Sequence, residues 1–110
     1  MNFYIGNSIE NLDLSSENIE FSDELIEFVY QNESKMDFDS SSLSQIDPYK
    51  DVLICNTKLV EILNICENLL KTNILDSYDD FDEANESIKG LSDLCQLAIT
   101  KNLSLISIGD

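Results

Sequence analysis

The sequence predicts a single α+β domain over residues 1–110, mostly helical, with short strands near the N-terminus, at about 52–55 and at the C-terminus. Three observations support this prediction. Two long segments carry apolar residues at helical spacing. Short apolar runs of strand character lie near both ends, where two strands could pair. Hydrophobic residues make up 43% of the chain, which is enough for one modest core, and no linker or internal repeat divides it.

The N-terminal third predicts two short strands and a helix. Residues 3–5 (Phe-Tyr-Ile) form a strand-like run that stops at Gly-Asn, and a second short strand is expected near 19–21. Ser22 is placed to cap a helix that runs to about Gln31, with acidic residues in the first turn, where the helix dipole favours them.

The middle of the chain predicts a long connection followed by a strand. Residues 32–44 are polar, and we expect a loop in which Met36 and Phe38 act as apolar anchors. Residues 46–49 indicate a turn, because the residue before a proline avoids the helical region. Residues 52–55 then predict a short buried strand.

The clearest helix covers residues 59–70, with Asn56 or Thr57 as its cap. Its apolar positions follow a helical face that is unusually wide, which is typical of a helix at the centre of a domain. They are Leu59, Val60, Ile62, Leu63, Ile65, Cys66, Leu69 and Leu70.

A second helix is expected from about 82 to 101, and a strand over 103–108 should follow it. Gly90 lies inside the helical pattern, where glycine costs up to about 1 kcal/mol relative to alanine. Asn102 is placed to end the helix as a C-cap. The apolar stripe of this helix comprises Ala84, Ile88, Leu91, Leu94, Cys95, Ala98 and Ile99.

The three cysteines predict buried free thiols. Cys55, Cys66 and Cys95 are odd in number, and each lies in an apolar stretch. With no export signal in the sequence, a disulfide framework is not expected. The chain has no histidine and no closely paired cysteines, so we expect neither a zinc site nor any other metal or cofactor.

Charge is the strongest compositional signal. Twenty-two acids face six lysines, with no arginine and no histidine, which gives a formal net charge of -16. The first 34 residues hold eight acids and no base. Such a surface repels phosphates, so nucleic acid and anionic membranes are not expected as partners, whereas a basic protein would be attracted. An alternative is that acidity serves solubility alone, although net charges of about 2–8 already suffice for that.

The sequence predicts no enzyme and no catalytic residue. Without histidine, the commonest general base and the usual partner of a nucleophilic serine or cysteine are missing. Neither a phosphate-binding P-loop nor a dinucleotide-binding glycine motif occurs, and the chain holds three glycines altogether. We therefore look for a binding surface.

The densest acidic run lies between residues 76 and 86. It is not an EF-hand, because the positions that require glycine and glutamate hold Phe81 and Ser87 when counted from Asp76. Two interpretations stay open: a solvated loop in which Asp79 or Asp80 caps the next helix, and an interface with aromatic side chains set among acids. The candidate partner-binding residues are Asp76, Tyr78, Asp79, Asp80, Phe81, Asp82, Glu83 and Glu86.

Segments along most of the chain, together with its acidity, length and lack of histidine, match one class of proteins. The segments are Phe3-Tyr4-Ile5-Gly6, Ser22-Asp23-Glu24-Leu25-Ile26, Ile46-Asp47-Pro48-Tyr49-Lys50-Asp51-Val52, the helix of residues 59–70 and Leu105-Ile106-Ser107-Ile108-Gly109-Asp110. In these features the chain resembles the small immunity proteins of contact-dependent growth inhibition. The resemblance implies a cytoplasmic inhibitor that binds one cognate basic toxin domain, often a nuclease, and occludes its active site. No motif of known role is matched, so no binding residue is carried over.

Two other functions stay open at this point. A nucleic-acid mimic would present two rows of carboxylates spaced like duplex phosphates and would inhibit several DNA-binding proteins. An acidic adaptor or chaperone subunit would instead use a hydrophobic groove. Leucine-rich helix faces also leave a homodimer open. The sequence shows no membrane-spanning run and no export signal, so we expect a cytoplasmic protein.

Overall fold

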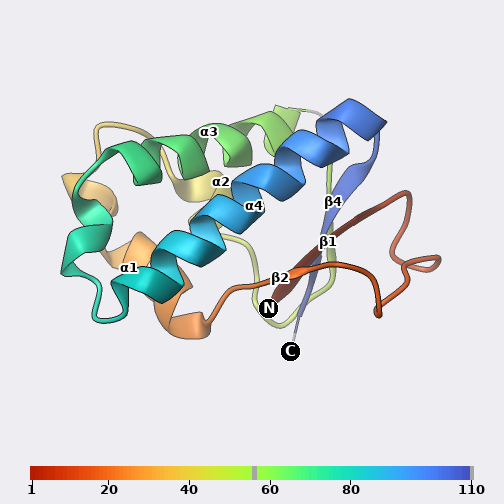
Figure 1. Ribbon diagram of the computed structural model, residues 1–110, viewed down its shortest axis with the longest axis horizontal. Coiled ribbons are helices and arrows are strands. Elements are labelled where there is room, and N and C mark those ends of the chain that lie inside the picture. The colour runs from red at the N-terminus through yellow and green to blue at the C-terminus, as the bar shows by residue number, and fades with distance from the viewer. Residues whose placement is uncertain (56, 110) are drawn as a thin grey trace.

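The computed structural model describes residues 1–55 and 57–109, and its centre is an antiparallel sheet formed by both ends of the chain. Strand β1 pairs with β4 from Asn2–Ile108 to Gly6–Ser104, and the sheet order is β2-β1-β4-β3 (Figure 1). The predicted α+β fold is confirmed, including the pairing of the terminal strands. The strands are β1 (Asn2–Gly6), β2 (Ile19–Glu20), β3 (Val52–Ile54) and β4 (Ser104–Ile108).

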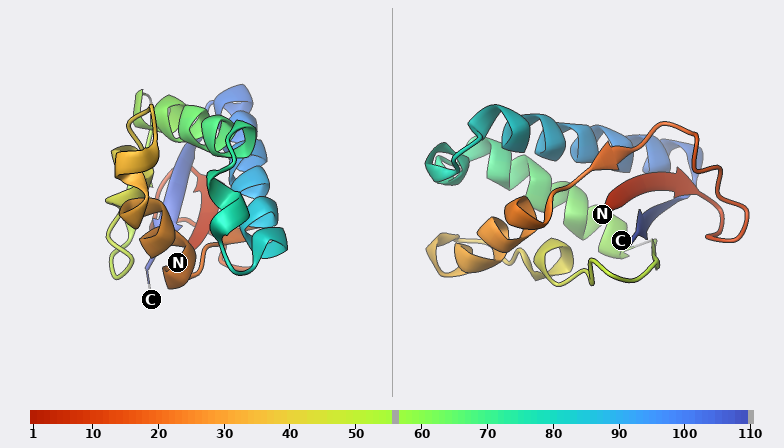
Figure 2. Two further views of the ribbon diagram at one scale, coloured as in Figure 1. Left: turned by 90° about the vertical axis from the view of Figure 1, so that its left-hand side faces the viewer. Right: turned by 90° about the horizontal axis from the view of Figure 1, so that it is seen from below.

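Two long helices, α3 (Thr57–Lys71) and α4 (Phe81–Lys101), lie side by side. The sheet underlies one half of this pair, and the first helical segments underlie the other half (Figures 1 and 2). None of the helices in the described parts of the chain is both long and apolar enough to cross a membrane. The shorter elements are α1 (Asp23–Gln31), η1 (Glu33–Lys35), α2 (Ser41–Ser44) and η2 (Ile74–Ser77), where η denotes a 3-10 helix.

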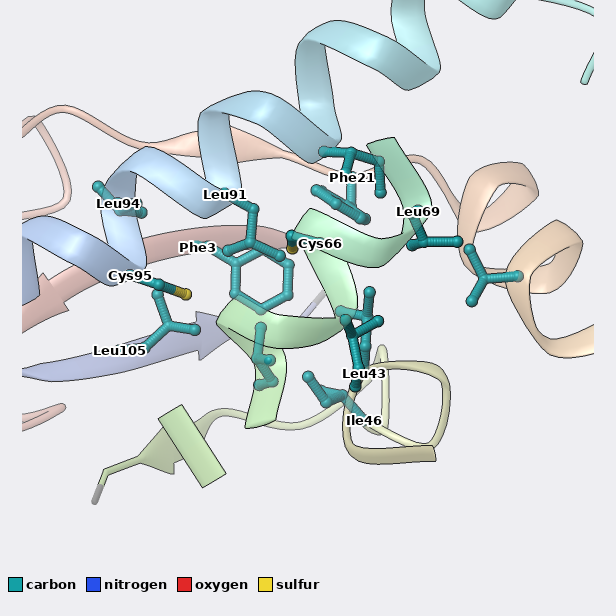
Figure 3. Packing of buried hydrophobic residues seen from close by; sticks show 14 of the residues in the cluster. Phe3, Phe21, Leu43, Ile46, Cys66, Leu69, Leu91, Leu94, Cys95 and Leu105 are labelled. Carbon is teal, nitrogen blue, oxygen red and sulfur yellow. The ribbon is translucent and has the colours of Figure 1, made fainter. Parts of the chain in front are cut away.

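One hydrophobic core fills the space between the helix pair and the elements beneath it (Figure 3). Phe3 of β1 packs edge-to-face on Phe21, with ring centroids 5.3 Å apart. Leu91 of α4 and Cys66 of α3 complete the contact from above (Figure 3). Each large side chain buried here contributes about 1.5–3 kcal/mol, so these residues hold the layers together.

The predicted helix caps are confirmed at two places. The Ser22 hydroxyl caps α1 by accepting the Leu25 N–H at 3.2 Å. Asn102 ends α4 in the left-handed conformation, at φ 56°. Thr57 is the first residue of α3 and therefore not its cap, and the alternative cap, Asn56, lies outside the described residues.

Helix α4 continues through Gly90, as predicted, and the structure gives a reason for a glycine there. A Cβ at this position would lie 2.6 Å from Ile19 Cδ1. The missing side chain therefore lets β2 approach the helix closely. The helical cost of glycine is offset by this contact between α4 and the edge of the sheet.

The strand predicted at residues 52–55 forms over Val52–Ile54, but of its three residues only Ile54 is buried. The prediction that Cys55 is buried was wrong. Strand β3 is at the edge of the sheet and pairs only with β4 among the described strands. Leu53 is consequently 44% exposed, and Cys55, which follows the strand, is also exposed. Cys66 and Cys95 are buried, as expected.

The polar stretch of residues 32–44 is not a plain loop, because it contains η1 and α2. Hydrogen bonds from the buried serine hydroxyls of this stretch explain why it folds into short helices. Ser40 donates to Glu33 Oε1 at 3.2 Å, and Ser44 donates to the same oxygen. Met36 and Phe38 are half-buried against the core, so their predicted role as anchors is confirmed.

The apolar faces of α3 and α4 are narrower than the sequence predicts. Val60 and Leu70 of α3 are 46% and 37% exposed, and Ile99 of α4 is 44% exposed. Helix α3 lies on the outside of the molecule rather than at its centre (Figure 2). The sheet spans only part of the helix pair, so apolar residues on the outward faces find no layer to cover them.

Candidate partner-binding surface

Helix α1 presents an acidic outward face. Three of its residues, Leu25, Ile26 and Val29, are buried and fix the orientation of the helix. Because side chains three and four positions apart share a face, the polar positions all point to solvent. The exposed residues of this face are Asp23, Glu24, Glu27, Tyr30 and Gln31.

The charges of this face are not balanced within the described residues, where no lysine lies within ion-pair distance of them. Asp23 and Glu24 lie in the first turn and interact favourably with the helix dipole. Glu27 lies one turn further on, faces the like charge of Asp23 at the i,i+4 spacing, and receives only a hydrogen bond from Gln31 Nε2 at 3.1 Å. Such a like-charge pair costs about 0.2–0.5 kcal/mol. The hydrogen bond from Gln31 and the like-charge pair have effects of similar size and opposite sign, so Glu27 adds little net stability to its own helix.

The structure joins this face to part of the predicted site. Tyr78 packs edge-to-face on Phe28 of α1, with ring centroids 5.0 Å apart. The contact places Tyr78 and Asp79 beside Glu24 and Glu27, around a shallow hollow of about 330 Å³. Two acidic regions separated by about fifty residues thus form one surface.

A second hollow lies on the other side of α1, and no sequence pattern predicted it. It has a volume of about 240 Å³ and separates α1 from the turn that contains Pro48 and Tyr49. Tyr30 and Tyr49, which are 56% and 72% exposed, line it together with Asp23 and Glu27. Glu27 lines both hollows. We call Asp23, Glu24, Glu27, Tyr30, Tyr49, Tyr78 and Asp79 the α1 surface.

Three of the predicted site residues contribute to the start of helix α4. Asp80 is its N-cap, with Oδ1 accepting the Glu83 N–H at 3.1 Å. This resolves the choice between Asp79 and Asp80 as the cap. Asp82 and Glu83 lie in the first turn, where the helix dipole favours negative charge. These three carboxylates are therefore explained by their role in stabilising the start of α4.

The remaining predicted residues do not form one patch. Asp76 is exposed on η2, and Phe81 is 43% exposed at the first position of α4. Glu86 is one turn further along α4 and lines a hollow with Ile19 and Glu20 of β2. The run of residues 76–86 is therefore divided, with one end at α1 and the other at the edge of the sheet.

The buried thiols are poorly suited to act as nucleophiles. Burial raises the pKa of the Cys66 thiol well above its usual value and raises the pKa of Cys95 to about 12. Both thiols are protonated at neutral pH, and the thiolate is the reactive form. Across residues 1–55 and 57–109, no group of acids and cysteines is arranged to hold a metal ion.

One serine lies near a lysine, but the pair lacks the arrangement that catalysis would need. Lys58 Nζ donates to Ser42 Oγ at 3.4 Å and pairs with Glu61 at 3.7 Å, and its side chain is 67% exposed. Ser42 in turn donates to Glu61. The Ser42 hydroxyl is directed at the Glu61 carboxylate and not at the lysine, so Lys58 is not placed to act as the base for this serine.

No family model, curated protein or solved structure matches this chain. We therefore infer the function from the α1 surface.

Proposed function

We propose that this chain is a cytoplasmic immunity protein that binds a cognate basic toxin domain, of the nuclease class, and occludes its active site. The observation that supports this most directly is the α1 surface. It combines carboxylates that have no lysine partners among the described residues with exposed tyrosines. Tyrosines are enriched at the centres of protein interfaces, and unpaired charge steers a partner of opposite sign.

The mechanism of this inhibition is electrostatic and steric. A nuclease binds phosphates with basic side chains, and the carboxylates of the α1 surface would take the place of those phosphates. Tyrosine rings on both sides of α1 would supply the apolar contacts that slow dissociation. The chain then acts by covering a site and carries out no reaction of its own.

An acidic adaptor or chaperone subunit is the second candidate function, because of a separate hollow beside β3. This hollow has a volume of about 530 Å³ and is lined by Ile46, by Ile62 and by the three residues of β3. It is the kind of apolar surface that an adaptor would use for a partner's segment. The hollow shares no lining residue with the α1 surface, so the two candidates predict different contact residues.

The test begins with the partner. A tagged copy of the chain captures proteins from its native host, and the captured proteins are identified after washes at low and then high salt. We expect one basic polypeptide that is retained at low salt and released at high salt. Expressed alone, this polypeptide should cleave nucleic acid and stop growth, and co-expression of the chain should restore growth.

Two results would overturn the proposal. Capture of many unrelated DNA-binding proteins would favour the nucleic-acid mimic. A single partner that is harmless when expressed alone, and that fails to fold or be exported without the chain, would favour the adaptor.

A further inference from the structure

We propose that the hollow between α1 and the turn at residues 45–51 receives one arginine side chain of the partner protein. We call it the Tyr30–Tyr49 hollow, and its lining includes Asp23, Ile26, Glu27, Tyr30, Pro48 and Tyr49. The inference rests on the proposed function, because it requires that the partner be a basic protein.

The size of the hollow fits a side chain better than a small molecule. Its volume of about 240 Å³ lies below the range of roughly 300–1,000 Å³ that is typical of small-molecule pockets. Its walls are the apolar surfaces of Ile26 and Pro48 and the two tyrosine rings. A long side chain with an apolar stem matches these walls.

The charge of the hollow selects a cation. Asp23 and Glu27 are four residues apart and so lie on the same side of α1 at the wall of the hollow. Lys50 is next to Tyr49 in the chain, but it is not part of the described lining. A cation that enters would therefore meet two carboxylates without competition from a lysine of the lining.

Arginine fits better than lysine for two reasons. A guanidinium stacks on a tyrosine face while its outer N–H groups donate in parallel to a carboxylate. It is also more weakly hydrated than an ammonium, so moving it against apolar walls costs less. The chain itself contains no arginine, so a second copy of this protein cannot supply the side chain.

The test uses a probe that does not depend on the partner. N-acetyl-arginine methylamide is titrated into the full-length protein, and the ring signals of Tyr30 and Tyr49 are followed by NMR. We expect saturable shifts with the arginine probe, weaker shifts with the lysine analogue and none with the uncharged citrulline analogue. Equal shifts with citrulline, or tighter binding of lysine, would overturn the proposal.

Variants locate the binding. Tyr49→Ala should raise the Kd of the arginine probe about fivefold. This change corresponds to about 1 kcal/mol, the size of an exposed cation–π contact. The side chain of Tyr49 is 72% exposed, and its backbone N–H, which donates to Asp47 Oδ1, is retained in alanine, so the variant should fold. Tyr49→Phe keeps the ring and should bind as the parent does. Phe81→Ala removes an exposed aromatic outside the hollow and should have no effect.

The two proposals fail in different ways. If Tyr49→Ala leaves the captured partner as tightly bound as before, while neutralising Glu24 and Asp79 releases it, the arginine site is wrong and the proposed function stands. If the arginine probe binds as described but no toxic partner exists, the proposed function is wrong and the site stands.

Discussion

Two groups of acids on this protein have opposite surroundings. Glu33 and Glu61, around α2 and the start of α3, accept hydrogen bonds from serine hydroxyls, and Glu61 also pairs with Lys58. Asp23 and Glu24 of the α1 surface have no such donors among the described residues. The same residue type therefore has two roles. Acids of the first group bond to their neighbours in the fold, whereas those of the second keep their charge available to the partner that we propose.

The largest expected effect is on partner binding. Glu24→Gln, Glu27→Gln and Asp79→Asn together remove three charges from the α1 surface. We expect the Kd for the captured partner to rise about hundredfold, because close charge pairs across an interface contribute from about 1.5 kcal/mol upward. The Kd is measured by titration calorimetry at two salt concentrations, and the parent protein should show the steeper salt dependence.

A matched control separates this effect from net charge. Glu10→Gln, Glu17→Gln and Asp93→Asn remove the same charge from exposed positions outside the α1 surface. We expect little change in Kd. If both triple variants weaken binding equally, the overall charge attracts the partner and the α1 surface has no special part in it.

The second expected effect is on stability, at the acids that bond within the fold. Glu33→Ala should lower the free energy of unfolding by about 1–3 kcal/mol, because the buried hydroxyls of Ser40 and Ser44 lose their acceptor. Urea denaturation measures the loss. Glu33→Gln keeps an acceptor oxygen and should lose less. A Glu33→Ala variant as stable as the parent would mean that the comparison between the two groups of acids is wrong.

The smallest expected effect is an increase in stability. Glu27→Gln removes the like-charge pair with Asp23, so it should raise the free energy of unfolding by about 0.2–0.5 kcal/mol at low salt. The same change should weaken partner binding. A substitution that raises stability but weakens binding is typical of a residue that is retained for function. Glu67→Gln in α3 is the control. Lys71 lies four residues later and interacts favourably with Glu67, so this change should not raise the free energy of unfolding. If Glu27→Gln is destabilising, Glu27 has a structural role that its surroundings do not show.

Much of the fold follows from local patterns in the sequence. The apolar spacing of residues 59–70, the hydroxyl of Ser22 and the left-handed preference of Asn102 each act within one or two turns, so each could be predicted. The exposure of Cys55 could not be predicted in this way. It depends on which strand takes the edge of the sheet, and that is decided by pairing with residues far away in the chain.

Only part of the candidate site could be predicted, because local sequence patterns do not show which distant residues come together. Acidic composition identified residues 76–86, and Tyr78 and Asp79 do lie on the α1 surface. Their proximity to Glu27 depends on the contact between Tyr78 and Phe28, which no local pattern contains. Tyr49 gave one signal that could have been used: it follows a proline in a predicted turn, and connecting segments lie on the protein surface.

The pairing of β1 with β4 has a consequence for the timing of folding. Asn2 pairs with Ile108, so the central strands meet only after nearly the whole described chain has left the ribosome. Contacts between such distant residues slow folding, because the intervening chain must be closed into a loop first. Until then, β1 can pair only with the two residues of β2, and the edge that β4 will occupy stays open. Under the proposed function, a cell would therefore need a store of finished molecules, because half-made chains could not hold the α1 surface in place.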